Sequence, residues 1–379
     1  MMRAGRASNF DSGLLGAVLG LLVLGLLVIF SASHVTAGAS KVLRQGIWAL
    51  VGLAGLLVFS RVDYRPWARY WRALLLASCV TLVATLLIAH PINGARSWIN
   101  LGPMSLQPSE FTKLALIISL AGFLSRQGEK LQQLPIFLRS ILYLLAPILL
   151  IMAQPDMGTA MVLCMIWLVM LWVAEARGVM ILAVTGSAVL LMTVAWYLPM
   201  PNGKTLIKDY QKKRLDFLHA DPAGSGYHQR QARIAIGSGE LWGQGYLRGS
   251  QAQRGFLPEQ ETDFIYAVLG EEFGLLGCLL VLGLYLFMLF RMLRISEEAE
   301  TVFGRLIVAG VGAMVAVHVV INIGMCLSLS PVTGVPLPLL SYGGSNILTT
   351  LLATGVVLNI SRHRQTRRTW VVTETLVRG

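Results

Sequence analysis

Residues 254–274 read RGFLPEQETDFIYAVLGEEFG, and this stretch leads from a polar loop directly into a long apolar run. Asp263 lies at the boundary between the two. A carboxylate is costly to keep where water meets hydrocarbon, so an acid in this position is a candidate functional residue. A structural role is equally compatible with the local chemistry, because Thr262 or Asp263 could cap the helix that follows. The stretch predicts a membrane-spanning helix that begins beside a candidate functional acid.

The composition extends this interpretation to the whole chain. Of the 379 residues, 55% are hydrophobic and 13% are charged, and apolar runs close to the ~20 residues of a bilayer crossing recur along the sequence. We expect one all-α, polytopic membrane domain over residues 1–379, with a large extracytoplasmic loop at 199–262 between spans seven and eight and a basic tail at 362–379. The ten expected spans, of which the fourth is short, lie at residues 13–32, 43–60, 72–90, 110–124, 137–153, 159–175, 178–198, 263–290, 304–328 and 338–360.

The placement of basic residues predicts the orientation in the membrane. Short cytoplasmic loops carry the excess of Lys and Arg in membrane proteins. With a cytoplasmic N-terminus, the cytoplasmic connections collect most of the short-loop arginines, and the short outer segments hold only Lys41, Arg44, Arg96 and Lys113. We therefore expect both termini in the cytoplasm. The net charge of +12 is then a topology signal with attraction to anionic lipid, and it implies no nucleic-acid partner.

Neither the cysteines nor the histidines predict a dedicated site. Each of the four cysteines lies inside a predicted span, and none has CxxC spacing. We expect them to pack as small apolar residues and not to form a disulfide framework. The six histidines are scattered, and no pair has ligand spacing beside a carboxylate on one helix face. We expect no metal site built from protein side chains.

Two longer segments interrupt the helical pattern. The 199–262 loop mixes aromatic and aliphatic residues with charge, and its IAIGSGELWGQGYLRG string at 234–249 predicts a folded cap with short re-entrant or interfacial helices. The second segment, SPVTGVPLPLLSYGGSN at 330–346, has too many prolines and glycines for a continuous helix. Irregular backbone at membrane depth persists only when it is buried in protein or lines a water-filled cavity. We expect this second segment to form part of a cavity wall.

Several single residues have ordinary structural interpretations. Trp98 could be an interfacial anchor, and Glu110 with Lys113 an ion pair at i,i+3. Asp156 is typical of a cap on the sixth span. His318 and Asn322, four residues apart in the ninth span, favour a hydrogen-bonded pair between helices over a proton relay.

Four polar strings together carry a resemblance to a known family. They are NGARSWINLGPMSLQPSEFTKLALI at 93–117, QPDMGTA at 154–160, the run from YQKKRL at 210–215 through LPEQETDF at 257–264, and SPVTGVPLPLLSYGGSN. In order and spacing the chain resembles the SEDS proteins (shape, elongation, division and sporulation) over residues 13–362. DPAGSGYHQRQ at 221–231 and PVTGVPLP at 331–338 are more similar to the RodA branch than to the FtsW branch.

The resemblance implies a peptidoglycan glycosyltransferase that polymerises lipid II at the outer face of the bacterial cytoplasmic membrane. By the LPExxTDF motif, Asp263 is the expected general base, which deprotonates the sugar hydroxyl that attacks the donor. The resemblance also implies pyrophosphate or sugar contacts at cationic residues. The residues assigned to binding, lining or bracing the site are Arg96, Lys113, Arg214, Arg44, Trp98, Gln211, Asp156, Glu110 and Ser341.

The same resemblance implies the partners. They are lipid II and its undecaprenyl-pyrophosphate-linked glycan, a class B penicillin-binding protein that crosslinks the strands, the elongation machinery and membrane lipid. No cofactor is certain; Mg²⁺ or Mn²⁺ could bind together with the substrate pyrophosphate.

Some residues depart from the family pattern. Glu240 stands where family members commonly have Gly, Gln244 where Lys or a small polar residue is common, and Arg254 with Gly255 replaces a more neutral pair. We expect altered loop packing and retained activity. Glu271 and Glu272 match the paired acids of the family, and bracing against a basic neighbour is favoured over catalysis.

Three alternative functions remain open from the sequence. A flippase for a lipid-linked precursor fits ten spans and a broken segment, although the unusual polar residues lie almost all on the outer side. An FtsW-like polymerase of cell division shares the chemistry. A scaffold for a partner enzyme would leave Asp263 replaceable.

Overall fold

The computed structural model describes residues 10–34, 39–89, 97–101, 104–197 and 225–363, and long helices dominate it. The helices that run the length of the bundle are α1 (Ser12–Ser33), α2 (Ala39–Phe59), α3 (Trp67–Ile88), α4 (Pro108–Leu124), α5 (Leu134–Ala153), α6 (Met157–Val173), α7 (Gly178–Tyr197), α11 (Ile265–Glu297), α12 (Val302–Cys326) and α13 (Gly344–Arg362). The short elements are β1 (Ile99–Leu101), β2 (Met104–Leu106), η1 (Gly128–Gln132), α9 (Ser225–Ser238) and α10 (Ser250–Gln253).

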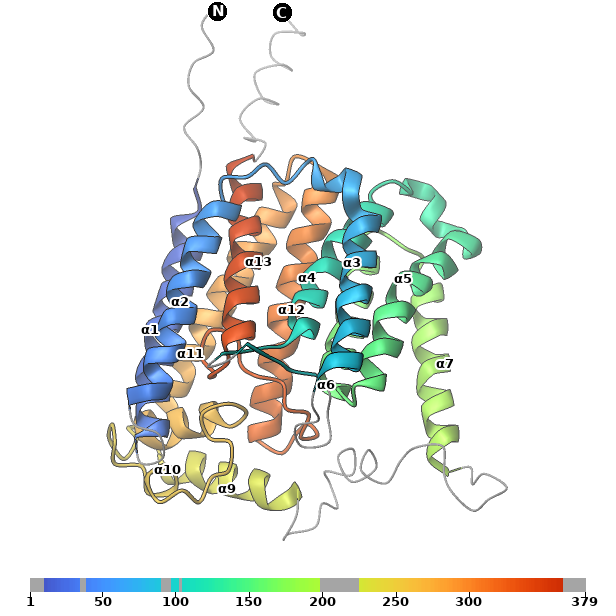
Figure 1. Ribbon diagram of the computed structural model, residues 1–379. Helices are drawn as coiled ribbons and strands as arrows, with labels where there is room; N and C mark the ends of the chain where they lie inside the picture. Colours follow the sequence, from blue (N-terminus) through green and yellow to red (C-terminus); the bar gives the residue numbers. More distant parts are fainter. Residues whose placement is uncertain (1–9, 35–38, 90–96, 102–103, 198–224, 364–379) are drawn as a thin grey trace, which may run out of the picture.

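The predicted all-α, polytopic fold is confirmed. In the described part of the chain, eight helices are long and apolar enough to cross a membrane, and α6 is a shorter apolar helix. The long helices lie side by side in one bundle (Figure 1). The number of spans stays a prediction, because α4 and α6 each have 17 residues. α4 is nevertheless buried on almost every side, as expected of a central helix.

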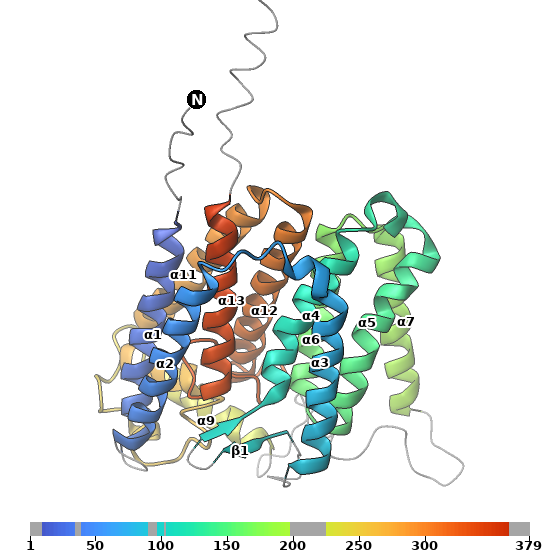
Figure 2. The same ribbon diagram turned by 45° about the horizontal axis from the view of Figure 1, so that its top comes forward.

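The two ends of the bundle differ. α1 begins and α13 ends at one end (Figure 1), and the β1–β2 hairpin, α9 and α10 lie at the other (Figures 1 and 2). The two strands pair antiparallel, with Ile99 opposite Leu106. The described part of the predicted 199–262 loop therefore contains two short helices, and its first residues lie outside the described ranges.

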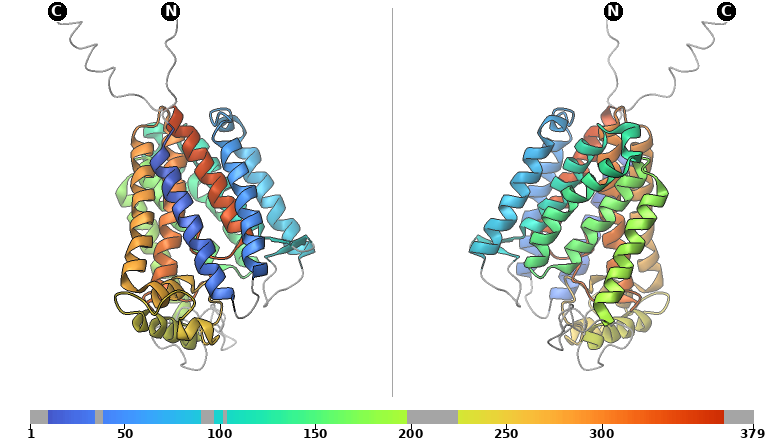
Figure 3. Two further views of the ribbon diagram at one scale, coloured as in Figure 1. Left: turned by 90° about the vertical axis from the view of Figure 1, so that its left-hand side faces the viewer. Right: turned by 90° about the vertical axis from the view of Figure 1, so that its right-hand side faces the viewer.

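Glycines bring α2 and α13 into close contact, and the two helices lie alongside each other (Figure 3). A Cβ added to Gly52 would lie 2.5 Å from the Leu351 side chain, and one added to Gly355 would lie 2.7 Å from the main-chain oxygen of Leu56. Small residues let helices approach closely in a membrane, where packing drives association. The α2–α13 pair depends on this close approach.

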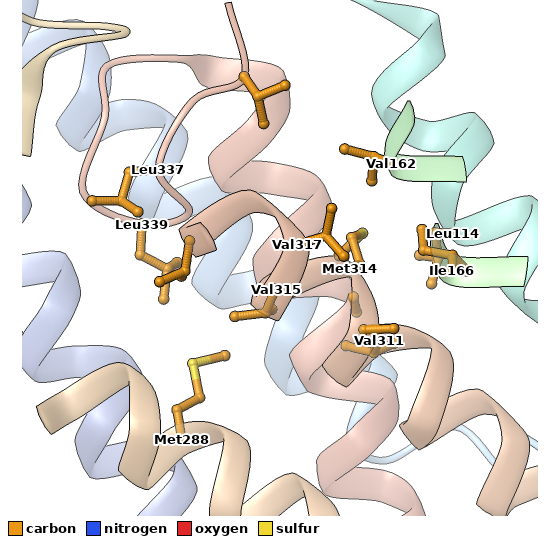
Figure 4. Close-up of a cluster of buried hydrophobic side chains, with 14 of the residues drawn as sticks. Leu114, Val162, Ile166, Met288, Val311, Met314, Val315, Val317, Leu337 and Leu339 are labelled. Atoms are coloured by element: carbon orange, nitrogen blue, oxygen red, sulfur yellow. The ribbon is translucent and has the colours of Figure 1, made fainter. Parts of the chain in front are cut away.

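α12 lies at the centre of the hydrophobic core. In Figure 4, side chains of α12 face α4 and α6 on one side, and α11 and the connection between α12 and α13 on the other. The buried side chains around α12 include Leu114, Val162, Ile166, Met288, Leu337 and Leu339. A residue on α12 can thus contact several elements that are distant in sequence.

α11 is interrupted near its N-terminal end. Gly274 has φ 65° and ψ −163° inside the helix, a conformation open almost only to glycine. The interruption frees main-chain groups, and residues of the loop before α10 satisfy them. The N–H of Leu275 donates to the oxygen of Glu240 at 2.9 Å, and the N–H of Leu276 donates to the oxygen of Leu241 at 3.3 Å. The loop is hydrogen-bonded into the interrupted helix.

The loop before α10 also donates hydrogen bonds to α11. The N–H of Gln244 donates to Glu271 O at 2.9 Å, and that of Gly245 to Glu272 O at 3.1 Å. Glu240 has φ 47°, a left-handed conformation that favours glycine. This backbone geometry is one that glycine would adopt without strain, in agreement with the glycine that the family resemblance implies here.

We predict that Gly274→Ala lowers the thermal midpoint of the purified protein in detergent, followed by tryptophan fluorescence. A Cβ at this position would lie 2.4 Å from Gly243 N, and the backbone conformation alone costs a non-glycine residue about 1–3 kcal/mol. Gly283→Ala in the same helix is the matched control, because its new Cβ meets nothing within 4 Å. Equal midpoints for the two variants would show that the interruption is dispensable.

Candidate functional site

The irregular connection between α12 and α13, residues 330–343, is fixed to α2 by one buried glutamine. Gln45 Nε2 donates to the main-chain oxygen of Ser341 at 3.1 Å. Gln45 Oε1 accepts from the N–H of Gly343, also at 3.1 Å. The Ser341 hydroxyl oxygen accepts from Leu337 N at 2.9 Å, so this predicted lining residue braces the segment. One side chain on α2 and one inside the segment hold its irregular backbone.

The same 330–343 segment also contacts the residues before α11. The N–H of Tyr342 donates to Glu261 O at 2.8 Å, and the Glu261 carboxylate forms an ion pair with Lys41 of α2. At the other end of the segment, a Cβ added to Gly158 of α6 would lie 2.7 Å from Thr333 O. The segment is thereby packed between α2, α6 and the LPEQETDF loop.

Asp263 lies where α12 meets this segment. Its main-chain oxygen accepts from Asn322 Nδ2 at 2.9 Å, and the same nitrogen donates to Val335 O at 2.9 Å. A Cβ at Gly334 would lie 3.5 Å from Asp263 Oδ2. Phe264 holds the N-cap position of α11, so neither Thr262 nor Asp263 has the capping position that the structural alternative required.

Lys113 is buried in a network that joins three helices. Its ammonium donates to Glu110 Oε1 at 2.7 Å and to His318 Nε2 of α12 at 2.8 Å. Asn346 Nδ2 of α13 donates to the other Glu110 oxygen at 3.1 Å. Lys113 is 2% and Glu110 3% exposed, and a buried ion pair is stable only when its remaining hydrogen bonds are satisfied. The predicted Glu110–Lys113 pair is confirmed.

Asp156 joins the starts of α4 and α6. Its Oδ1 accepts from Thr159 N at 3.0 Å and its Oδ2 from the Thr159 hydroxyl at 2.8 Å, which confirms the predicted cap. The same Oδ2 accepts from Gln107 Nε2 at 3.1 Å. The Gln107 N–H in turn donates to the Ser345 hydroxyl oxygen at 2.8 Å. Asp156 is therefore a bracing residue between two helix starts.

The remaining predicted site residues are not described in contact with this network. Trp98 precedes β1 and is half-buried, and Arg44 is an exposed residue of α2. Arg96, Gln211 and Arg214 lie outside the described residues. Of the predicted set, the structure brings Glu110 and Lys113 into direct contact and places Asp263 beside the 330–343 segment, which contains Ser341.

One sequence expectation is confirmed and one is corrected. His318 and Asn322 each form a hydrogen bond to an element outside α12, as expected: His318 contacts Lys113 of α4, and Asn322 contacts the main chain at Asp263. Glu271 and Glu272 were expected to brace a basic neighbour. Instead Glu271 accepts from the N–H groups of Gln251 and Ala252 at 2.6 and 3.0 Å, and Glu272 from the Ser31 hydroxyl. The first-turn amides of α10 lack intrahelical partners, and the Glu271 carboxylate satisfies them.

Sequence reasoning missed Gln45 and Asn346. Both are buried amides that hold groups distant in sequence. The available signal was a polar residue within an apolar run, but its partner could not be read from the sequence. Over the described residues, no group of three or more His, Cys, Asp or Glu side chains has metal-site geometry.

Comparison with known proteins identifies the family. Residues 12–366 match the family model for the cell cycle proteins FtsW, RodA and SpoVE. The chain is 38% identical over 368 residues to a probable peptidoglycan glycosyltransferase FtsW of Trichlorobacter lovleyi, with 94% of each protein covered. It is 37% identical over 369 residues to the peptidoglycan glycosyltransferase MrdB of Escherichia coli K12, covering 94% of this chain and 95% of MrdB.

Solved structures agree with this assignment. A chain from a study titled "Structural coordination of polymerization and crosslinking by a peptidoglycan synthase complex" is similar with TM-score 0.78 and 28% identity, covering 93% of this chain and 98% of that one. The rod shape determining protein RodA of Thermus thermophilus is similar with TM-score 0.70 and 27% identity, covering 94% and 98%. The chain belongs to the FtsW/RodA/SpoVE family, the SEDS proteins.

Proposed function

We propose that this protein joins lipid II disaccharides into β-1,4 glycan strands at the outer face of the cytoplasmic membrane. Undecaprenyl pyrophosphate leaves, and the anomeric carbon inverts. Family membership and the relatives named peptidoglycan glycosyltransferases support this proposal. The structural observation that carries it is the position of Asp263. Asn322 of α12 donates to the main-chain oxygen of Asp263 and also to that of Val335 in the 330–343 segment.

In the proposed reaction, the Asp263 carboxylate accepts the proton of the acceptor sugar's 4-hydroxyl as the oxygen attacks the donor's anomeric carbon. One base is enough, because pyrophosphate leaves without being protonated and needs positive charge instead. This separates the proposed site from the two-carboxylate arrangement of glycoside hydrolases. A single carboxylate in this position fits transfer better than hydrolysis.

The leaving pyrophosphate needs a positive charge nearby, and Lys113 is the cation within the described residues that best fits this role. An ammonium group has three donors. Among the described residues, the bonds to Glu110 and His318 use two of them, which leaves one for a substrate oxygen. Arg96, Arg214 and Arg44 stay proposed contacts for pyrophosphate or sugar groups, and Trp98, Gln211 and Asp156 stay proposed lining or bracing residues.

We expect Asp263→Asn to reduce polymerisation of purified lipid II by about 10²- to 10⁴-fold, the usual contribution of a positioned base. The assay uses the full chain with its class B penicillin-binding partner, and gel-resolved glycan is the readout. Glu259→Gln is the matched control, because Glu259 is an exposed acid in the same loop and has no proposed role in catalysis. Equal polymer from Asp263→Asn and wild type would exclude Asp263 as the base and favour a scaffold.

We also propose that both termini are cytoplasmic and that the site faces outward. The start of α1 and the end of α13 share one end of the bundle with the α2–α3 connection, which contains Arg61 and Arg65, and with the first turn of α3, which contains Arg69 (Figure 1). The positive-inside rule makes that end cytoplasmic. A C-terminal green fluorescent protein fusion should fluoresce, and a C-terminal alkaline phosphatase fusion should be inactive. The reverse pattern would invert the topology and place the site inside.

The proposed cellular role is elongation of a rod-shaped cell, with the elongation machinery and a class B penicillin-binding protein as partners. The RodA-like strings in the sequence support this role, and the structural similarity to a chain from a peptidoglycan synthase complex supports the partner. Depletion of the protein in its host should produce round cells. Filamentous cells with blocked septa would assign it to division instead.

A further inference from the structure

One face of α12 contacts both groups that the proposed reaction needs. His318 and Asn322 are four residues apart, so their side chains leave the same face of the helix about one turn apart. His318 is 2% and Asn322 0% exposed. His318 contacts Lys113, and Asn322 contacts the main chain of Asp263. The helix turn between them therefore links the cation and the carboxylate.

The bonding roles of His318 follow from its two partners. A main-chain oxygen only accepts, so the contact of His318 Nδ1 with Met314 O at 2.6 Å requires that Nδ1 donate. An ammonium only donates, so Nε2 accepts from Lys113 at 2.8 Å. The ring is thus a neutral acceptor fixed to its own helix, and it directs the ammonium of Lys113.

Asn322 uses its whole donor capacity on two segments. A side-chain amide nitrogen has two hydrogens, and here they go to Asp263 O and Val335 O, each at 2.9 Å. The second contact of Asp263 O with α12 is the weak thiol donor of Cys326, at 3.9 Å. Without Asn322, the buried Val335 oxygen and the part-buried Asp263 oxygen would each lose an amide donor. That loss incurs a desolvation cost, so the local backbone would shift.

We propose that Asn322 is a positioning residue for catalysis, which holds the main chain of Asp263 at a fixed distance from Lys113. The inference rests on the proposed function of Asp263 as general base. Asn322 touches neither substrate nor the reacting atoms in this account. It acts through the backbone that carries the carboxylate, and α12 supplies the rigid spacing to the His318–Lys113 pair. The expected signature is a lower kcat at nearly constant KM, because the transition state needs this alignment more than binding does.

Asn359 of α13 provides a matched control. It is also a buried asparagine, 1% exposed, and its Nδ2 donates to a main-chain oxygen, that of Ser60, at 3.1 Å. That contact lies at the bundle end opposite the site, beside the end of α13 (Figure 1). Replacing either asparagine removes a buried amide and a helix-to-backbone bond, and only one of the two changes affects Asp263.

The test measures steady-state polymerisation by the full chain with its partner, together with thermal midpoints. Asn322→Ala should lower kcat about 10- to 100-fold, since small misplacements of reacting groups can cost about 10²-fold, and should leave KM nearly unchanged. Asn359→Ala should lower the midpoint comparably and keep wild-type kcat. Asn322→Asp keeps the volume of the side chain and loses its two donors, so it should behave like Asn322→Ala. It tests the positioning role if the alanine variant does not fold.

Asp263→Asn in the same assay separates the two hypotheses. If Asp263→Asn is inactive while Asn322→Ala and Asn322→Asp keep wild-type kcat, the positioning role is wrong and the base assignment stands. If Asn359→Ala loses as much kcat as Asn322→Ala, the loss reports general destabilisation and the positioning role is again wrong. If Asp263→Asn keeps full activity, the proposed base itself is overturned, and the positioning role falls with it.

Discussion

The structure depends on one constraint: non-helical backbone within a helical bundle must have its N–H and C=O groups satisfied by protein. The 330–343 segment meets this constraint through Gln45 and Asn322, whose side chains bind main-chain oxygens of the segment at Ser341 and Val335. The interruption of α11 at Gly274 meets it through the exchange with the loop before α10. Both irregular regions adjoin the end of the bundle that carries the proposed site.

The same requirement explains why so many polar side chains here are buried and yet bound. Asn322 donates to an oxygen of the segment and to an oxygen of Asp263 at once. The same side chain therefore fixes the backbone of the segment and the backbone that carries the Asp263 carboxylate. Lys113 follows a related rule, because a buried ammonium is tolerated only with Glu110 and His318 as partners. Structural and functional demands therefore fall on the same residues.

Apolar runs made the helices predictable. The fourth span was expected at 110–124, and α4 is Pro108–Leu124; the ninth was expected at 304–328, and α12 is Val302–Cys326. Local chemistry likewise predicted the Asp156 cap and the Glu110–Lys113 pair, because each partner is three residues away. These contacts are set by helix geometry alone.

What sequence could not supply were partners distant along the chain. The Gly274 interruption was hidden because glycines inside a helical pattern, such as those in LGEEFGLLGC at 269–278, are also compatible with an unbroken helix. His318 and Asn322 were expected to form hydrogen bonds between helices, but the identity of their partners depends on how α4, α12 and the 330–343 segment pack together. The partners of Glu271 were missed because they are main-chain amides of α10, which have no side-chain signature.

The most direct test of the account is a structure of the Asp263→Asn variant bound to two lipid II molecules, one in each sugar position. The account predicts that the acceptor's 4-hydroxyl lies within hydrogen-bonding reach of the residue at 263, about 2.6–3.2 Å, with the donor pyrophosphate on the side of Lys113. An acceptor hydroxyl far from residue 263, with another carboxylate in reach, would contradict the central claim.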